Sequence, residues 1–176
     1  MIRALFFALF SVLVFSCATS KISSKPNYQV FTDTNGSKAL KGIINRSILV
    51  NDSSFQWFVE NGKYGEADAS AVAAFQKNGS KITLLVLFGT WCHDSHNLLP
   101  KFYRLIDKAG FPESKIVLVA VDKSKTAVQQ LHVKYQLKTV PTFIVLMNGK
   151  EIGRVEEYGK TGYMEKELGE IVAAIQ

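Results

Sequence analysis

The stretch LFGTWCHDSH, residues 87–96, decides the fold, because a long apolar run ends there and a single cysteine, Cys92, follows a tryptophan. The run begins at residue 82, and its length and β-branched content are typical of a strand buried on both faces of a sheet. Apolar residues then recur at helical spacing as far as Gly110, so we predict a helix that begins at or just after Cys92. Pro100 lies inside this helix and predicts a kink.

The same alternation of elements extends on both sides of this stretch. Upstream, Asp68 can cap a helix that ends at Gly79. Downstream, residues 115–122 predict a second buried strand and residues 124–136 predict a helix with three inward apolar side chains. These are Val128, Leu131 and Tyr135. Strand, helix, strand, helix is the order expected of an α/β sheet.

The last part of the chain predicts a hairpin and a closing helix. Asn148 and Gly149 lie between two strand-like runs, which is a strong signal for an antiparallel hairpin. Residues 161–175 carry apolar side chains on one helical face. The sheet is therefore expected to be mixed, with its last two strands antiparallel.

Taken together, these features resemble the thioredoxin family. The motifs that carry the resemblance are FGTWC at the start of the long helix, Pro100 within it, TVPT at 139–142, NG at the hairpin and Gly159 after the last strand. The resemblance implies a thioredoxin-like α/β fold over residues 66–176, with a central mixed β-sheet flanked by helices. It also implies that Pro141 is a cis proline whose loop lies against Cys92. Trp91, Val140 and Pro141 are then expected to contact the substrate, with the backbone of Val140 pairing with an extended segment.

Two positions depart from the dithiol members of that family. The second cysteine of their Cys-x-x-Cys motif is Ser95 in this chain. The buried acid that they keep six residues before the first cysteine is Val86. The two departures agree with each other, because a protein with no resolving thiol needs no base to activate one.

Cys92 is therefore expected to work as a monothiol. The first turn of a helix favours the thiolate, and Ser95, one turn along the same face, is expected to hydrogen-bond to the sulfur. Such a thiolate can form a mixed disulfide with a protein partner, but an external low-molecular-weight thiol or a reductase must complete the turnover. We therefore predict thiol-disulfide exchange on protein thiols or disulfides, with Cys92 and Ser95 as catalytic residues and no cofactor.

Other roles for Cys92 are open at this point. Cys92 and His96 lie at i and i+4 and could give two ligands to Cu(I) in a non-catalytic binding module, with His132 as the remaining histidine. A buried structural thiol is a further alternative. A one-cysteine peroxidase is disfavoured, because its motif would need proline at position 85 and threonine or serine at position 89.

The N-terminal residues predict export. Arg3 precedes an apolar run that is too short to span a bilayer, so residues 1–16 are interpreted as a signal peptide. The end of this run resembles the bacterial lipobox, which implies lipidation of Cys17. The alternative is ordinary cleavage after Ala18. In both cases Cys17 is lost as a thiol partner, although the whole chain has only two cysteines.

Residues 17–27 are Ser- and Lys-rich and predict a flexible tether to a membrane. Residues 28–65, with a strand-like run at 43–50, are expected to be an N-terminal extension packed on the domain. The expected location is the cell envelope, lipid-anchored and facing the periplasm. The net charge of +6 is spread along the chain, so no nucleic-acid surface is expected.

Overall fold

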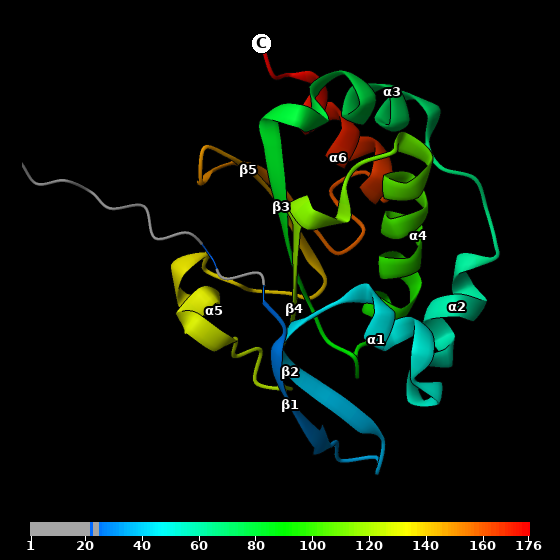
Figure 1. The fold of residues 1–176 in the computed structure, drawn as a ribbon, viewed down its shortest axis with the longest axis vertical. Coiled ribbons are helices and arrows are strands. Elements are labelled where there is room, and N and C mark those ends of the chain that lie inside the picture. Colours follow the sequence, from blue (N-terminus) through cyan, green and yellow to red (C-terminus); the bar gives the residue numbers. More distant parts are fainter. Residues whose placement is uncertain (1–21, 23–24) are drawn as a thin grey trace, which may run out of the picture.

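A six-stranded mixed sheet forms the centre of the molecule, as the computed structural model shows for residue 22 and residues 25–176 (Figure 1). The strand order is β1-β2-β4-β3-β5-β6. The strands are β1 (Asn27–Thr32), β2 (Lys38–Ile44), β3 (Ile82–Phe88), β4 (Ile116–Ala120), β5 (Thr142–Met147) and β6 (Lys150–Glu156). Only β3 and β4 pair in parallel, whereas each other neighbouring pair is antiparallel.

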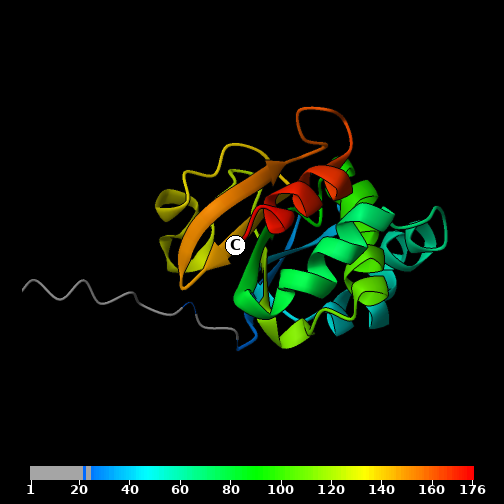
Figure 2. The ribbon, with the colours of Figure 1, turned by 90° about the horizontal axis from the view of Figure 1, so that it is seen from above.

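Helices cover both faces of this sheet unequally. The helices are α1 (Arg46–Asn51), α2 (Gln56–Gly62), α3 (Ala69–Asn78), α4 (His93–Ala109), α5 (Leu131–Lys134) and α6 (Met164–Ala173). Only the short α5 lies on one side, and α3, α4 and α6 pack together on the other (Figures 1 and 2). Alternate side chains of β3 enter the two cores, with Val86 on the α4 side and Leu87 on the α5 side. This two-sided burial explains why β3 is a continuous apolar run.

The predicted elements around Cys92 are confirmed. The side chain of Asp68 accepts a hydrogen bond from the backbone N–H of Ala71 at 2.8 Å and so caps α3. Helix α4 begins at the residue after Cys92, contains Pro100 and ends at Ala109, and its C-cap Gly110 has a left-handed φ of 66°. Asn148 also has a positive φ and forms the turn between β5 and β6 with Gly149.

The helix expected at 124–136 is wrong for most of its length. The side chain of Asp122 accepts hydrogen bonds from the backbone N–H of Thr126 at 2.9 Å and from its hydroxyl at 2.5 Å, which holds the chain in a turn. Gln129 and Gln130 then have positive φ, so regular α-helix is confined to α5. Local side-chain hydrogen bonds of this kind compete with helix formation.

The strand predicted at 43–50 is found only as far as Ile44. Strand β2 ends at Ile44, and the chain turns into α1, whose Leu49 is fully buried. Strand β1 begins at Asn27, one residue inside the range expected for the tether, and Ile22 packs against the core on the α5 side. The predicted signal peptide and the lipidation site Cys17 lie outside the described residues. Across residues 25–176, none of the helices has the length and hydropathy needed to cross a bilayer.

Candidate functional site

The cysteine predicted to be reactive, Cys92, lies between β3 and α4. Cys92 is the N-cap residue of α4, and its carbonyl accepts the backbone N–H of His96 at 3.0 Å. Its own N–H donates to the carbonyl of Gly89 at 3.0 Å, which closes a tight turn before the helix. The side chain is partly exposed, and it is the one cysteine in the described part of the chain. The N-cap position puts Cys92 at the positive end of the helix dipole, although its side chain makes no capping hydrogen bond.

The loop before β5 brings a carbonyl to this sulfur. The Val140–Pro141 peptide bond is cis, as expected. The Sγ of Cys92 donates to the carbonyl of Val140 at 3.2 Å, so the thiol and the loop are in direct contact. The carbonyl of Pro141 accepts the N–H of Glu157 at 2.7 Å, which ties this loop to the end of β6. The structure thus brings Cys92, Val140 and Pro141 together.

Ser95 lies at the expected place but makes a different contact. Its side chain is completely buried, and its Oγ accepts the backbone N–H of Gly89 at 3.2 Å. No hydrogen bond joins Ser95 to the sulfur of Cys92 within residues 25–176, so the expected donation to the sulfur is not found. Ser95 instead holds the backbone at the end of β3.

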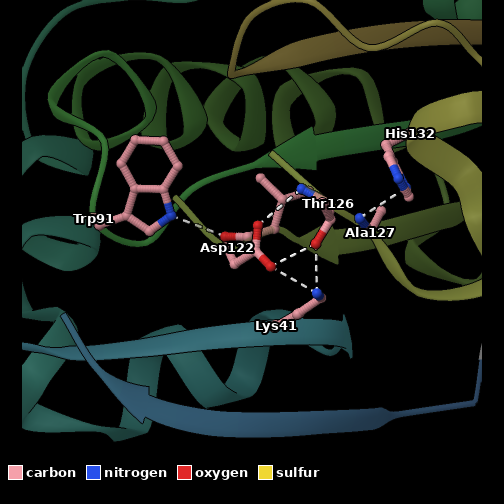
Figure 3. A network of polar contacts seen from close by, with 7 residues as sticks. Lys41, Trp91, Asp122, Thr126, Ala127 and His132 are labelled. Atoms are coloured by element: carbon pink, nitrogen blue, oxygen red, sulfur yellow. Dashed lines mark hydrogen bonds and ion pairs between the residues drawn. The ribbon is translucent and has the colours of Figure 1, made fainter. Parts of the chain in front are cut away.

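Trp91 points away from the helix toward the loop after β4. Its indole Nε1–H donates to the carbonyl of Val121 at 2.9 Å (Figure 3). The ring lies so close to Gly89 that a Cβ at this glycine would come within 2.7 Å of it. Only glycine therefore fits this position without displacing the tryptophan.

A polar network next to Trp91 stabilises the same loop (Figure 3). Lys41 of β2 forms an ion pair with Asp122 at 2.6 Å and donates to the hydroxyl of Thr126 at 2.5 Å. Burial would raise the pKa of Asp122, but hydrogen bonds from Lys41 and Thr126 outweigh it and lower the pKa to about 2. Asp122 is therefore ionised at neutral pH, and the network links the N-terminal hairpin to the loop that receives Trp91.

Three further contacts with the site come from the N-terminal segment, and no local sequence pattern predicts them. The buried Oγ1 of Thr90 accepts the backbone N–H of Leu40 in β2 at 3.0 Å. The ring of Trp57 in α2 stacks on His96, with 4.2 Å between ring centroids and 18° between planes. The side-chain amide of Asn61 donates to the carbonyl of His96 at 3.0 Å. Both the loop and the first turn of α4 are therefore braced by residues far upstream.

The surroundings of His96 favour its neutral form. Burial lowers its pKa, and this effect outweighs the opposing effect of the Thr90 carbonyl, with a smaller contribution from His93 that also lowers it. Its Nε2 lies 2.7 Å from the carbonyl of Thr90, and because a carbonyl only accepts, Nε2 carries the proton. A neutral imidazole gives little charge support to a thiolate at Cys92.

The same geometry leaves fewer histidine nitrogens for the copper alternative. The Nε2 of His96 is engaged by Thr90, and the Nδ1 of His132 accepts the N–H of Ala127 at 3.0 Å. Within the described residues, no group of three or more potential ligands among His, Cys, Asp and Glu is placed to hold a metal ion.

Comparison with known proteins agrees with this geometry. The family model for thioredoxin matches residues 67–170, which is more than half of the chain. The chain belongs to the thioredoxin family. Thioredoxin from Echinococcus granulosus is 32% identical over 100 residues, which cover 57% of this chain and 87% of that protein. The chloroplastic thioredoxin Y of Oryza sativa subsp. japonica is 31% identical over 81 residues, or 46% of this chain and 45% of its own length.

A solved structure supports the fold alone. An HIV epitope scaffold superposes with a TM-score of 0.51 at 18% identity, covering 73% of this chain and 90% of the scaffold. The thioredoxin family match includes Cys92, Ser95 and the Val140–Pro141 loop. It excludes Lys41, Trp57 and the rest of the N-terminal segment that braces the site.

Proposed function

We propose that this thioredoxin-family protein carries out monothiol exchange on protein substrates through Cys92. The observation that carries the proposal is the pairing of a partly exposed thiol at a helix N-cap with a serine in the buried position one turn later. The thiol can be reached by a partner, whereas Ser95 has no sulfur with which to release one. The chain is proposed to act in the cell envelope, tethered through a lipidated Cys17 and facing the periplasm.

The proposed reaction removes a small thiol R–SH that is bound to a protein P as P–S–S–R. The Cys92 thiolate attacks the sulfur of R, the P–S bond electrons leave with P as its thiolate, and Cys92–S–S–R forms. A second R–SH attacks the sulfur of R in this adduct, giving R–S–S–R and returning Cys92 to the thiol. The protein partner is reduced, and the external thiol is oxidised.

The Val140–Pro141 loop is proposed to guide the partner. The carbonyl of Val140 accepts from the sulfur of Cys92 at 3.2 Å, and a thiolate has no proton for this contact. Ionisation therefore releases that carbonyl, which can then accept a backbone N–H from an extended partner segment. Trp91, whose indole N–H donates to the carbonyl of Val121, is proposed to form the neighbouring wall of this binding surface.

The test uses a protein substrate that carries a labelled small-thiol adduct, with the free small thiol in excess. The purified chain should release the label over repeated turnovers, and Cys92→Ala should reduce the rate to that of the small thiol alone. Ser95→Ala should still turn over with added small thiol, because the reaction needs no group at that position for resolution, although the backbone N–H of Gly89 loses its acceptor. Ser95→Cys should release the label from Cys92 without added small thiol, since it restores a dithiol.

Equal rates for the wild type and Cys92→Ala would overturn the proposal. Copper retained by the purified wild-type chain and lost in His96→Ala, together with equal rates, would favour the binding-module alternative instead.

A further inference from the structure

A hollow of about 690 Å³ lies at the end of the sheet opposite Cys92. The apolar part of its lining consists of Ile22, Ile82, Val117, Tyr135 and Leu146. Strand β3 starts at this hollow and ends next to the Cys92 loop, whereas β5 starts at Thr142, directly after Pro141, and ends in the hairpin that borders the hollow. At about 3.3 Å per residue, the seven residues of β3 separate the hollow from the reactive loop by roughly 23 Å.

Three lysines border the hollow and no acidic residue does. They are Lys81, Lys115 and Lys134. Within residues 25–176, none of the ion pairs involves these three side chains.

These lysines contact backbone oxygens, an amide oxygen and an aromatic ring. Lys81 donates to the side-chain oxygen of Asn78 and to the carbonyl of Gln176, at 3.3 and 3.2 Å. Lys115 donates to the carbonyl of Ser80 at 2.6 Å, and the ammonium of Lys134 lies 5.2 Å from the centroid of Tyr135. Within residues 25–176, no Asp or Glu side chain forms an ion pair with these three ammonium groups, so the rim of the hollow carries positive charge.

The N-terminal chain reaches the body at this hollow. Ile22 packs against the core on the α5 side, and it is five residues from Cys17. Even a fully extended chain spans at most about 3.6 Å per residue, so a lipid on Cys17 would hold Ile22 within roughly 18 Å of the bilayer. A protein anchored in this way would therefore keep the hollow near the lipid headgroups.

We propose that the hollow bordered by Lys81, Lys115 and Lys134 is the face of the protein that docks on an anionic lipid surface. The proposal rests on the tether at Cys17, and it adds an orientation that the thiol chemistry does not require. Lysines near an anionic bilayer each contribute favourably, and a lipid anchor combined with a basic patch binds more stably than one signal alone. Docked in this way, the protein points Cys92 away from the membrane toward partners in the aqueous space.

The test compares binding of the purified full chain to vesicles of phosphatidylcholine alone and to vesicles that also contain phosphatidylglycerol. Co-sedimentation should show tighter binding to the anionic vesicles, and this preference should weaken as salt is added. Replacing Lys81, Lys115 and Lys134 together with glutamine should lower the preference by about fivefold for each lysine removed. The matched control replaces Lys63, Lys138 and Lys160, which are exposed and do not border the hollow, and it should leave the preference unchanged.

A second measurement needs no substitution. Brief labelling of wild-type lysines with a water-soluble amine reagent, read by mass spectrometry, should show protection of the three rim lysines on anionic vesicles only. Lys63 and Lys138 should be labelled equally on both kinds of vesicle, and a water-soluble thiol reagent should reach Cys92 equally in both.

The proposal would be overturned if the two triple variants lost the preference for anionic vesicles equally. Protection of Cys92 on anionic vesicles would also overturn it. So would rim lysines that are protected by an acidic protein but not by anionic vesicles, which would assign the face to a protein partner. An absent lipid on Cys17 lowers binding to both kinds of vesicle alike, whereas a wrong assignment of the face removes only the difference between them. Neither readout depends on exchange by Cys92, so failure of the proposed reaction remains distinguishable.

Discussion

Two regions of the chain reach the Cys92 loop, and they differ in origin and in role. Residues 67–170, which match the thioredoxin family, supply the thiol, the buried serine and the Val140–Pro141 loop. Residues 27–62 lie outside that match and supply the hydrogen bond to Thr90 and the ring stacked on His96. The first region supplies the residues of the proposed chemistry, and the second holds the loop in position and packs on the histidine.

The two regions also share one hydrophobic core. Phe55 and Leu49, from the segment outside the family match, are buried in the same apolar cluster as Phe102 of α4 and Phe143 of β5. A shared cluster predicts that the two regions unfold together. The N-terminal segment would then be part of one cooperative unit rather than an appendage.

The largest expected change in stability comes from a substitution that disrupts this shared core. Phe55→Ala should lower the free energy of unfolding by about 3–5 kcal/mol, because it removes a ring that is only 1% exposed. Denaturant unfolding checks this, with fluorescence of the tryptophans and far-UV circular dichroism recorded on the same samples. Val59→Ala is the control, since Val59 in α2 is 43% exposed and its truncation should cost no more than about 0.5 kcal/mol. Two separate transitions in the wild type would show that the regions are independent.

A smaller effect is expected at the contact between β2 and the reactive loop. Thr90→Val keeps the shape of the side chain but leaves the N–H of Leu40 without its acceptor, so we expect a loss of about 1–3 kcal/mol. The rate of Cys92 alkylation at fixed pH should also change, because the loop is no longer held. Thr90→Ser retains the hydroxyl and should restore both quantities toward the wild type. An unchanged alkylation rate in Thr90→Val would show that β2 only packs beside the site.

The smallest expected effect is a pH dependence at His96. Burial lowers its pKa in the folded state below the ordinary value of 6.5, so the unfolded chain binds the proton more tightly. The free energy of unfolding should therefore be unaffected by this residue well above pH 6.5 and should decrease as the pH falls through and below that value. His96→Gln can still donate to Thr90 but does not titrate, so its stability should depend less on pH in this range. Identical slopes for the two proteins would contradict the burial of a neutral imidazole beneath Trp57.

Much of the family-matched region could be predicted because its signals are local. The apolar run of β3, the cap at Asp68 and the Asn148–Gly149 turn each depend on residues that are close in sequence. The failures lie where distant contacts override local pattern. Residues 124–136 have helical periodicity, but Asp122, held by Lys41, keeps the preceding loop in a turn.

The candidate site divides in the same way. The pattern around Cys92 predicted its place at the start of a helix, the resemblance to the thioredoxin family implied the cis bond at Pro141, and residue identity alone puts a serine where the dithiol members have their second cysteine. Only the tertiary structure decided that Ser95 holds Gly89 rather than the sulfur, and that His96 lies beneath Trp57 as a neutral base. Hydrogen-bond partners and solvation depend on which distant segments pack against a side chain, and a linear pattern does not contain that information.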